Sequence, residues 1–477
     1  MTSHPGGADT GSAAPPSSKA TPLSGAVAKI MRRVTPLFAV MMMCNQLNRS
    51  NIGYAESHLE ADLGIGATAY GLGAGLFFIA YFLFEVPSNV LMKRFGPKIW
   101  LSRICVSWGV VSACMLFAQG PISFYVLRFL LGVAEAGFVP AVLYYLARWL
   151  PNDYRGRANA RYAVGALVAF SVSGPLSGPL LRMDGTFGLR GWQWMFLVEG
   201  VMSVAIGVVA FFRLDSRIED ARWLTADEKR ELTAAIDAED AEHADPAGDD
   251  RRSMWAVLRD PRILLFVFVY FSVQMSIYAN TFWLPSIVRD IKGTNDITVG
   301  LLSSVPWIFA MVAMFLLARI GDRTNRRKPL LIGALVAAAA GSYLAAVTSP
   351  WLALAMLTIA AMGFKSISPI FWPIVQRTVH PMVIGVAIAI INSIANLGGF
   401  VAPYGFGIVK DRTGSTQWGL IGLAVFSLIA ALASLLIREN DDRDSGLSRK
   451  RESGTAAPGR YPAAGGMAAG DISAKSI

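Results

Sequence analysis

The segment Leu37-Phe-Ala-Val-Met-Met-Met-Cys-Asn-Gln-Leu-Asn-Arg49 belongs to the first of twelve long apolar stretches in this chain. A helix of about 20 apolar residues is long enough to cross the ~30 Å hydrocarbon core of a bilayer. Charged residues make up only 16% of the chain, whereas soluble domains contain about 25%. We therefore expect an all-α membrane protein with many transmembrane helices.

The predicted spans form two groups of six, separated by one long polar segment. They cover residues 33–55, 70–93, 98–118, 122–147, 158–182 and 192–213, and then 262–288, 297–319, 328–347, 350–376, 384–410 and 416–437. We expect two six-helix bundles, at 29–213 and 261–438, joined by a cytoplasmic linker at 214–260. The polar, small-residue segments 1–28 and 439–477 are expected to be disordered tails.

The formal net charge of +10 would also suit a nucleic-acid-binding protein. Its Lys and Arg residues, however, collect in alternate loops, at Arg32-Arg33, Lys93-Arg94, Arg155 with Arg157, and Arg326-Arg327-Lys328. The loop 56–69 contains acidic residues but no Lys or Arg. Because basic loops stay in the cytoplasm, we place both termini there, in a multi-pass protein of the inner (plasma) membrane. Membrane topology explains the charge, and no nucleic-acid partner is expected.

The chain lacks the residue patterns of enzymes, metal sites and disulfide frameworks. Its three cysteines lie in apolar segments without metal-ligand spacing. None of its four histidines lies within a predicted span, and no H-E-x-x-H motif occurs. We expect no cofactor, no metal ion and no enzymatic activity. A sensor is the remaining alternative, but the linker and tails contain no recognisable signalling domain.

Two bundles joined by a tether are typical of secondary carriers, which bind substrate near the bilayer midplane between their halves. Gly71-Leu-Gly-Ala-Gly75 and Ser173-Gly-Pro-Leu-Ser-Gly-Pro179 would allow close packing or loosening of helices. Ordinary helix packing explains these motifs equally well. The pattern predicts transport by alternating access but does not identify the substrate.

Corresponding loops in the two halves resemble a known signature. The loop after the eighth span, from Ala318 through Asp322 and Arg323, resembles G-x-x-x-D-R-x-x-x-R-R/K of the major facilitator superfamily, with Ala in the first Gly place. The loop after the second span has Lys93 where that family has Asp. The resemblance implies the major facilitator fold of twelve transmembrane helices in two bundles. It makes Asp322 and Arg323 candidates for gating or structural charges.

Further motifs resemble the anion:cation symporter family within that superfamily. They are Leu47-Asn-Arg-Ser-Asn-Ile-Gly-Tyr54, Tyr81-Phe-Leu-Phe-Glu-Val-Pro-Ser-Asn89, Arg128-Phe-Leu-Leu-Gly-Val-Ala-Glu-Ala-Gly-Phe138, Gly191-Trp-Gln-Trp-Met-Phe196 and Phe371-Trp-Pro373. The resemblance is strongest to bacterial tartrate, phthalate and sugar-acid permeases. It implies a monomeric secondary active transporter that imports a small organic anion (a sugar acid, tartrate or an aromatic acid) with protons. An organic-anion exchanger or exporter is the alternative.

Arg49 and Glu135 are the leading site candidates, because a charge at membrane depth costs ~2.5–3.5 kcal/mol and normally faces protein or trapped water. The Arg49 guanidinium stays protonated and can bind a carboxylate bidentately. Burial would allow Glu135 to be neutral in one step of a cycle and ionised in another. The resemblance assigns substrate binding to Arg49 and proton coupling to Glu135. A permanent structural ion pair is the alternative for both.

Three further polar residues lie within the spans of the first half. Arg128 precedes Glu135 by two helical turns, about 10 Å, where it would fix that carboxyl or line an outer gate. Asn48 stands where members of the family have Asp, and an amide cannot exchange a proton. Asn48 is therefore a candidate substrate contact rather than a proton carrier. Either fewer protons move in each transport cycle, or another carboxyl takes the place of the usual Asp. Glu85 is expected to serve gating or structural pairing.

Lys365 lies near the middle of the tenth span. Together with Arg49 on the opposite side, Lys365 would give the site two positive charges, which suit a dicarboxylate. Pairing with an acidic residue or snorkelling to the membrane surface is the alternative. The other substrate-binding candidates are neutral groups at similar depth: Tyr81, Gln274, Tyr278, Asn392 and Asn396, with Trp372 as a stacking wall. Such groups orient substrate oxygens without the desolvation cost of an ion. Helix–helix hydrogen bonding is the alternative for each.

Overall fold

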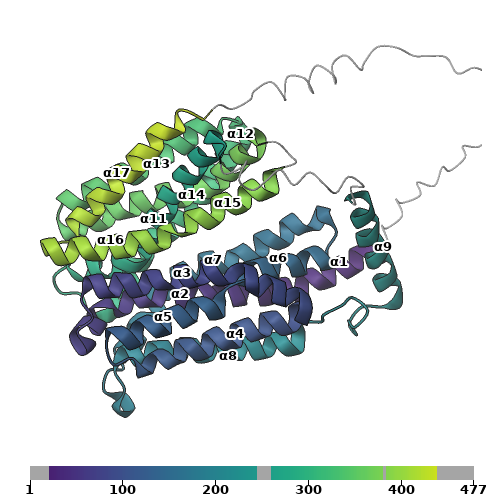
Figure 1. Ribbon diagram of the computed structural model, residues 1–477, viewed down its shortest axis with the longest axis horizontal. Coiled ribbons are helices and arrows are strands. Elements are labelled where there is room, and N and C mark those ends of the chain that lie inside the picture. Colours follow the sequence, from purple (N-terminus) through teal and green to yellow (C-terminus); the bar gives the residue numbers. More distant parts are fainter. Residues whose placement is uncertain (1–20, 244–258, 380–382, 438–477) are drawn as a thin grey trace, which may run out of the picture. The chain divides into compact units, whose positions relative to one another are not determined.

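The computed structural model describes residues 21–243, 259–379 and 383–437. Every regular element in these ranges is a helix (Figure 1). By length and composition, eleven helical segments of the described chain could cross a membrane. A twelfth, α2 (Thr35–Leu63), has 29 residues but carries many polar side chains. The all-α membrane fold predicted from the sequence is thus confirmed.

Each half of the chain forms its own set of packed helices. The first half contains α2 with α3 (Ala67–Phe95), α4 (Pro97–Cys114), α5 (Pro121–Glu135), α6 (Phe138–Trp149), α7 (Asn152–Leu181) and α8 (Gly191–Arg213). The second contains α11 (Pro261–Arg289), α12 (Asp296–Thr324), α13 (Arg327–Val347), α14 (Pro350–Thr378), α15 (Ile384–Asn396), α16 (Gly398–Thr413) and α17 (Gln417–Ser434). Between the halves, α3 packs on α16 and α7 packs on α12.

The fourth predicted span is two helices, α5 and α6, because the chain turns immediately after Glu135. Gly137 has a φ of 85°, a left-handed conformation that side chains with a Cβ rarely adopt. A Cβ there would also lie 2.5 Å from the Ser88 Oγ. Ser88 donates a hydrogen bond of 2.7 Å to the Ala136 carbonyl, which satisfies a backbone group at the break. The eleventh predicted span divides similarly into α15 and α16 at Leu397.

The tail predicted for residues 1–28 ends earlier than expected, because helix α1 (Pro22–Arg33) begins at Pro22. Proline suits the first helical turn, where a missing N–H costs nothing. Lys29 forms a 2.8 Å ion pair with Glu228 of α9 (Ala226–His243). Helix α9, of 18 residues, lies in the predicted linker. Residues 1–20, 244–258 and 439–477 lie outside the described ranges.

At the carboxyl end of α2, charged side chains join the two halves. Glu56 is 2% exposed and pairs with Lys410 of α16 at 2.8 Å. Its second oxygen accepts a hydrogen bond of 2.7 Å from Ser286 of α11. Nearby, the His58 imidazole lies 3.0 Å from the carboxylate of Asp296 at the start of α12. These contacts tie α2 to three helices of the second half.

Backbone groups also help to join the two halves at this end of the molecule. Asp411 of α16 accepts hydrogen bonds from the backbone N–H groups of Ala67 and Thr68, at 3.2 and 2.7 Å. The first N–H groups of a helix have no intrahelical acceptor, so a carboxylate stabilises them well. The Tyr70 hydroxyl donates to the Phe282 carbonyl at 3.1 Å. Helix α3 is therefore capped and anchored by the opposite half.

Helices α7 and α12 touch backbone to backbone. A Cβ added at Gly174 would lie 1.9 Å from the Gly300 carbonyl oxygen, and one at Gly300 would lie 2.3 Å from that of Gly174. Small residues permit such approach between membrane helices. At the other end of the molecule, beside α1 and α9, no ion pair or hydrogen bond found in the described ranges links the halves. Within the described ranges, the ion pairs and hydrogen bonds that close the two halves against each other thus lie at one end, the sealed end.

The Gly174→Ala substitution should weaken this closure, because its Cβ meets a backbone oxygen that cannot move aside. On a background without the native cysteines, Glu56→Cys and Lys410→Cys report closure through cross-linking by a short bifunctional thiol reagent. We expect Gly174→Ala to lower the cross-linking yield several-fold. Gly156→Ala is the control, since a Cβ at Gly156 of the same helix has no neighbour within 4 Å. Equal yields for both variants would contradict the account.

Candidate functional site

Arg49 of α2 reaches across to Glu135, the last residue of α5. Its Nε donates a hydrogen bond to Oε1 of Glu135, forming an ion pair. The Glu135 side chain is 0% exposed and that of Arg49 is 14% exposed. The second oxygen of Glu135 has no hydrogen-bond partner within the described residues, although buried polar atoms nearly always have one. The pair is therefore only partly satisfied by protein groups.

Aromatic side chains from both halves surround the Arg49 guanidinium. Its Cζ lies 5.1 Å from the ring centroid of Phe77 and 5.0 Å from that of Tyr81, both on α3. Such cation–π contacts stabilise a charge that is partly removed from water. Tyr278 of α11, from the second half, lies near Arg49 and packs against Phe78 of α3, with ring centroids 4.3 Å apart. Three predicted site residues, Arg49, Tyr81 and Tyr278, thus lie together.

Arg128 is the second buried cation of this cluster. Its side chain is 1% exposed, and none of its three guanidinium nitrogens has a hydrogen-bond partner among the described residues. Its Cζ lies 5.3 Å from the same Phe77 ring. Glu135 lies two helical turns further along α5, about 10 Å from Arg128 along the axis, and no ion pair between them is found within the described residues. Arg49 and Arg128 together carry two positive charges, of which the buried Glu135 balances one.

Two acidic groups set the balance of charge at the site. Glu135 ends α5, where the negative end of the helix dipole disfavours a carboxylate, while Arg49 favours it. Glu85, one turn beyond Tyr81 on α3, is partly exposed and electrostatically coupled to Arg49. No ion pair of Glu85 is found within the described residues. Protonation of either carboxyl would leave net positive charge.

Residues that the sequence did not single out complete the cluster. Asn45 lies one turn before Arg49 on the same helix face, and its buried amide has no hydrogen-bond partner within the described residues. Helical spacing from Arg49 could have found it. Phe77 carries no charge or motif, so nothing in the sequence distinguishes it from other aromatics. It reaches the arginines because Gly132 lets α5 approach α3: a Cβ there would lie 2.3 Å from the Phe77 carbonyl.

Asn48 lies in the packing between α2 and α8. Its Nδ2 donates to Ser203 at 2.8 Å and to the Cys44 carbonyl at 2.9 Å, and its side chain is 0% exposed. Both donor bonds of this predicted substrate contact are therefore directed at protein groups of its own half. One turn further along, Asn51 donates to fully buried Glu199 at 2.9 Å.

The predicted neutral residues of the second half form two groups. Gln274 of α11 donates to Asn396 of α15 at 2.8 Å. Asn392 lies one turn before Asn396, on the same helix face and partly exposed. Trp372 of α14 packs edge-on against Tyr270, with ring centroids 5.0 Å apart. Tyr270 is another residue without a sequence signal.

The α11 helix links the first of these groups to the arginine cluster. Gln274 precedes Tyr278 by one turn on the same face, and Tyr278 interacts with Arg49. A ligand held by Arg49 would therefore have amide groups about one turn, or roughly 5 Å, further along α11.

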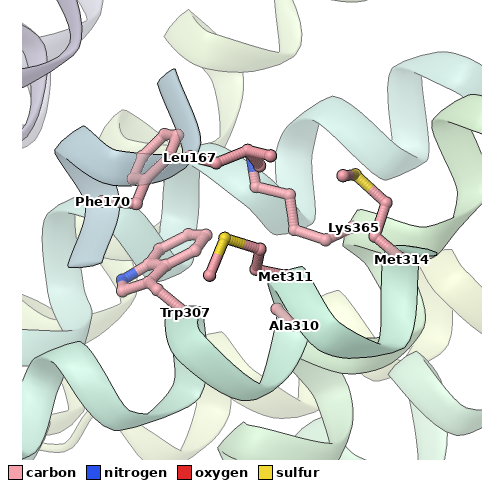
Figure 2. A pocket seen from close by; sticks show the side chains of 7 residues that line it. All are labelled: Leu167, Phe170, Trp307, Ala310, Met311, Met314 and Lys365. Carbon is pink, nitrogen blue, oxygen red and sulfur yellow. The ribbon is translucent and has the colours of Figure 1, made fainter. Parts of the chain in front are cut away.

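Lys365 of α14 lies beside α7 and α12 rather than beside Arg49. It lines a pocket of about 220 Å³, counting its open mouth, with six other residues: Leu167, Phe170, Trp307, Ala310, Met311 and Met314. Figure 2 shows the side chains that surround it, with the lysine reaching toward the α7 residues. Lys365 forms no ion pair within the described ranges.

The signature loop residues lie apart from the arginine cluster, at the carboxyl end of α12. Arg327 donates to Asp322 at 2.7 Å, and the Arg327 side chain is 14% exposed. Arg323 is exposed. The loop charges thus form a local pair, with Asp322 bound to Arg327.

Comparison with known proteins agrees with this fold. The family model of the Major Facilitator Superfamily matches residues 38–403. A protein named putative tartrate transporter, from Agrobacterium vitis, is 41% identical over 87% of this chain and 92% of its own length. A quinolone resistance transporter of Acinetobacter baumannii is 38% identical, covering 86% and 94%. The putative metabolite transport protein NicT of Pseudomonas putida is 34% identical over the same shares.

Solved structures add support for the fold alone. A bacterial homologue of the human lysosomal transporter Spinster superposes with a TM-score of 0.69 at 14% identity, covering 90% of this chain and 99% of that one. The xylose transporter XylE from E. coli gives 0.69 at 14% identity, with 87% and 98% covered. The residues matched by the family model and the full-length relatives lead to one conclusion. This chain belongs to the Major Facilitator Superfamily and is a multi-pass membrane transporter, not an enzyme.

Proposed function

We propose that the protein is a secondary active transporter that imports a small organic anion, a carboxylate, together with protons. The observation that carries this proposal is the buried cluster in which Arg49 and Arg128 both lie at the Phe77 ring and Arg49 pairs with the fully buried Glu135. When a carboxyl of this cluster is protonated, its net positive charge at membrane depth attracts a small anion. The name of the tartrate transporter relative supports the same substrate class.

Arg49 is the group that would hold the substrate carboxylate. Its planar fork binds a carboxylate through two parallel hydrogen bonds, and Glu135 occupies only its Nε edge in this structure. Tyr81 and Tyr278 lie beside the guanidinium and would orient the substrate. Because Tyr278 belongs to the second half, a bound anion would contact both halves and favour arrangements in which they close around it.

Glu135 would couple transport to protons through competition for Arg49. When Glu135 takes up a proton, its ion pair with Arg49 breaks and the guanidinium becomes free for the substrate carboxylate. When Glu135 releases the proton, it reclaims Arg49 and displaces the substrate to the same side. Asn48 cannot carry a second proton. Glu85 and Glu199 are other intramembrane carboxyls of this half, and Glu199 is fully buried and hydrogen-bonded by Asn51 and Ser177.

We propose the inner membrane as the location, with both termini in the cytoplasm. Basic residues gather at the ends of the helices nearest α1 and α9, as in cytoplasmic loops. The end sealed by the Glu56–Lys410 pair would then face the periplasm, and the described arrangement would be the inward-facing stage of alternating access. Each chain contains a complete site, so we propose that it works as a monomer.

An organic-anion exporter or exchanger is the second candidate, favoured by the name of the quinolone resistance relative. Uptake into proteoliposomes separates the two. An imposed inward proton gradient should accelerate accumulation by a symporter, whereas an exchanger accumulates substrate only when counter-substrate is present inside.

Arg49→Ala should weaken anion binding strongly, because loss of one partner from a buried charge pair costs about 2–5 kcal/mol. We expect at least ~30-fold weaker binding, corresponding to the lower of these energies. A thermal-shift screen of purified protein against tartrate, sugar acids and aromatic acids identifies the ligand and tests the variant. Arg262→Ala, at an exposed arginine in the first turn of α11, is the control. A ligand that stabilises Arg49→Ala as strongly as wild type would refute the assignment.

Glu135→Gln should separate binding from proton coupling, since the amide cannot exchange a proton but leaves Arg49 free. We expect proteoliposomes with this variant to lose accumulation driven by a proton gradient while retaining exchange of internal for external anion. Glu60→Gln, at an exposed carboxyl near the end of α2, should behave as wild type. Continued gradient-driven accumulation by Glu135→Gln would assign the proton to another group.

A further inference from the structure

We infer that Lys365 forms a second cationic subsite, which makes a dianion such as a dicarboxylate the preferred class of substrate. This inference rests on the proposed function, transport of an organic anion. It adds a binding residue in the second half of the chain, separate from the arginine cluster of the first half.

The surroundings of Lys365 provide no negative charge. Its Nζ lies 4.2 Å from the ring centroid of Phe170 and 5.4 Å from that of Trp307. The other residues lining the pocket are apolar or methionine, and no hydrogen bond or ion pair of Lys365 is found within the described part of the chain. Cation–π contacts return only about 0.5–2 kcal/mol. A structural ion pair therefore does not explain this lysine.

Snorkelling to the membrane surface does not explain it either. In α14, which runs from Pro350 to Thr378, Lys365 lies 15 residues from the first end and 13 from the second. At 1.5 Å per residue, each end is about 20 Å away, well beyond the reach of a lysine side chain. The ammonium is therefore held at mid-depth, where ionisable groups typically mark substrate or ion pathways.

Lys365 and Arg49 lie at similar depth. The hydroxyls of Ser50 and Ser173 are 2.8 Å apart, which fixes the register of α2 against α7. Phe170, the ring beside Lys365, precedes Ser173 by three residues, or about 4.5 Å along the axis. The lysine thus lies about one turn from the level of Arg49, on the side of α1 and α9. One cation thus comes from each half, and a ligand with two anionic groups would span from Arg49 to Lys365.

The pocket around Lys365 is suited to one end of a small molecule. In this structure the space beside the ammonium admits about one water-sized group, so a carboxylate would enter as the surrounding side chains move apart. Phe170 from α7 stacks on Trp307 from α12, with centroids 4.6 Å apart, so both halves form its wall (Figure 2). Met311 and Met314 are flexible and can adjust to an entering group. A lysine ammonium offers three donors to a carboxylate.

Matched anions that differ only in the second carboxylate test this inference: tartrate against threonate, galactarate against galactonate, and phthalate against benzoate. Competition with transported substrate is measured for wild type, Lys365→Met and Lys365→Arg. In wild type we expect the dianion of the recognised pair to compete at least ~10-fold better than its monoanion. Lys365→Met should lose that preference by weakening only the dianion, and Lys365→Arg should retain it.

The outcomes separate the two proposals. If Lys365→Met weakens competition by both members of a pair equally, the lysine serves the packing of α14 against α7 and the inference is wrong. The proposal of transport dependent on Arg49 still stands in that case. Wild-type preference for monoanions overturns the inference without needing any variant to fold. If wild type recognises none of these carboxylates, both proposals fail. The melting temperature of each variant without ligand is measured alongside, to detect loss of packing.

Discussion

The ion pair of Arg49 with Glu135 is the interaction on which the proposed chemistry depends. Its carboxylate is fully buried and its guanidinium nearly so, at a depth where water cannot compensate a lost partner. The pair must therefore remain together, or a proton and a substrate anion must take its place together. The helix break after Glu135 adds to this constraint, because the end of α5 disfavours a negative charge that lacks a cation.

Contacts between the two halves connect the exchange of partners at Arg49 and Glu135 to the arrangement of the whole transporter. At the sealed end, the halves are held by the Glu56–Lys410 pair, the capping of α3 by Asp411, and the close approach of Gly174 to Gly300. These contacts are small in number and specific, so they can be replaced by a different set in another arrangement. The arginine cluster is reached by Tyr278 of the second half, so filling or emptying it changes the contacts between halves.

The sequence predicted the features that stand out against an apolar background. The long apolar spans and the charged residues within them, Arg49, Glu135 and Lys365, were visible because hydrocarbon excludes polar groups. The sequence offered ion pairing of Arg49 and Glu135 only as an alternative, because pairings depend on helix register, which close contacts such as that of Gly132 with Phe77 decide. The helical start of α1 was missed because its composition resembles the preceding tail, although Pro22 suits a first helical turn and α1 packs against α9.

The central claim is that a proton and a substrate carboxylate compete through Glu135 and Arg49. Calorimetric titration of the purified protein with its anion, in two buffers of different ionisation enthalpy, measures the protons exchanged on binding. The account predicts uptake of about one proton per anion bound, because linkage requires Glu135 to be protonated as Arg49 is taken by substrate. Binding with the same heat in both buffers, and hence no proton uptake, would contradict it.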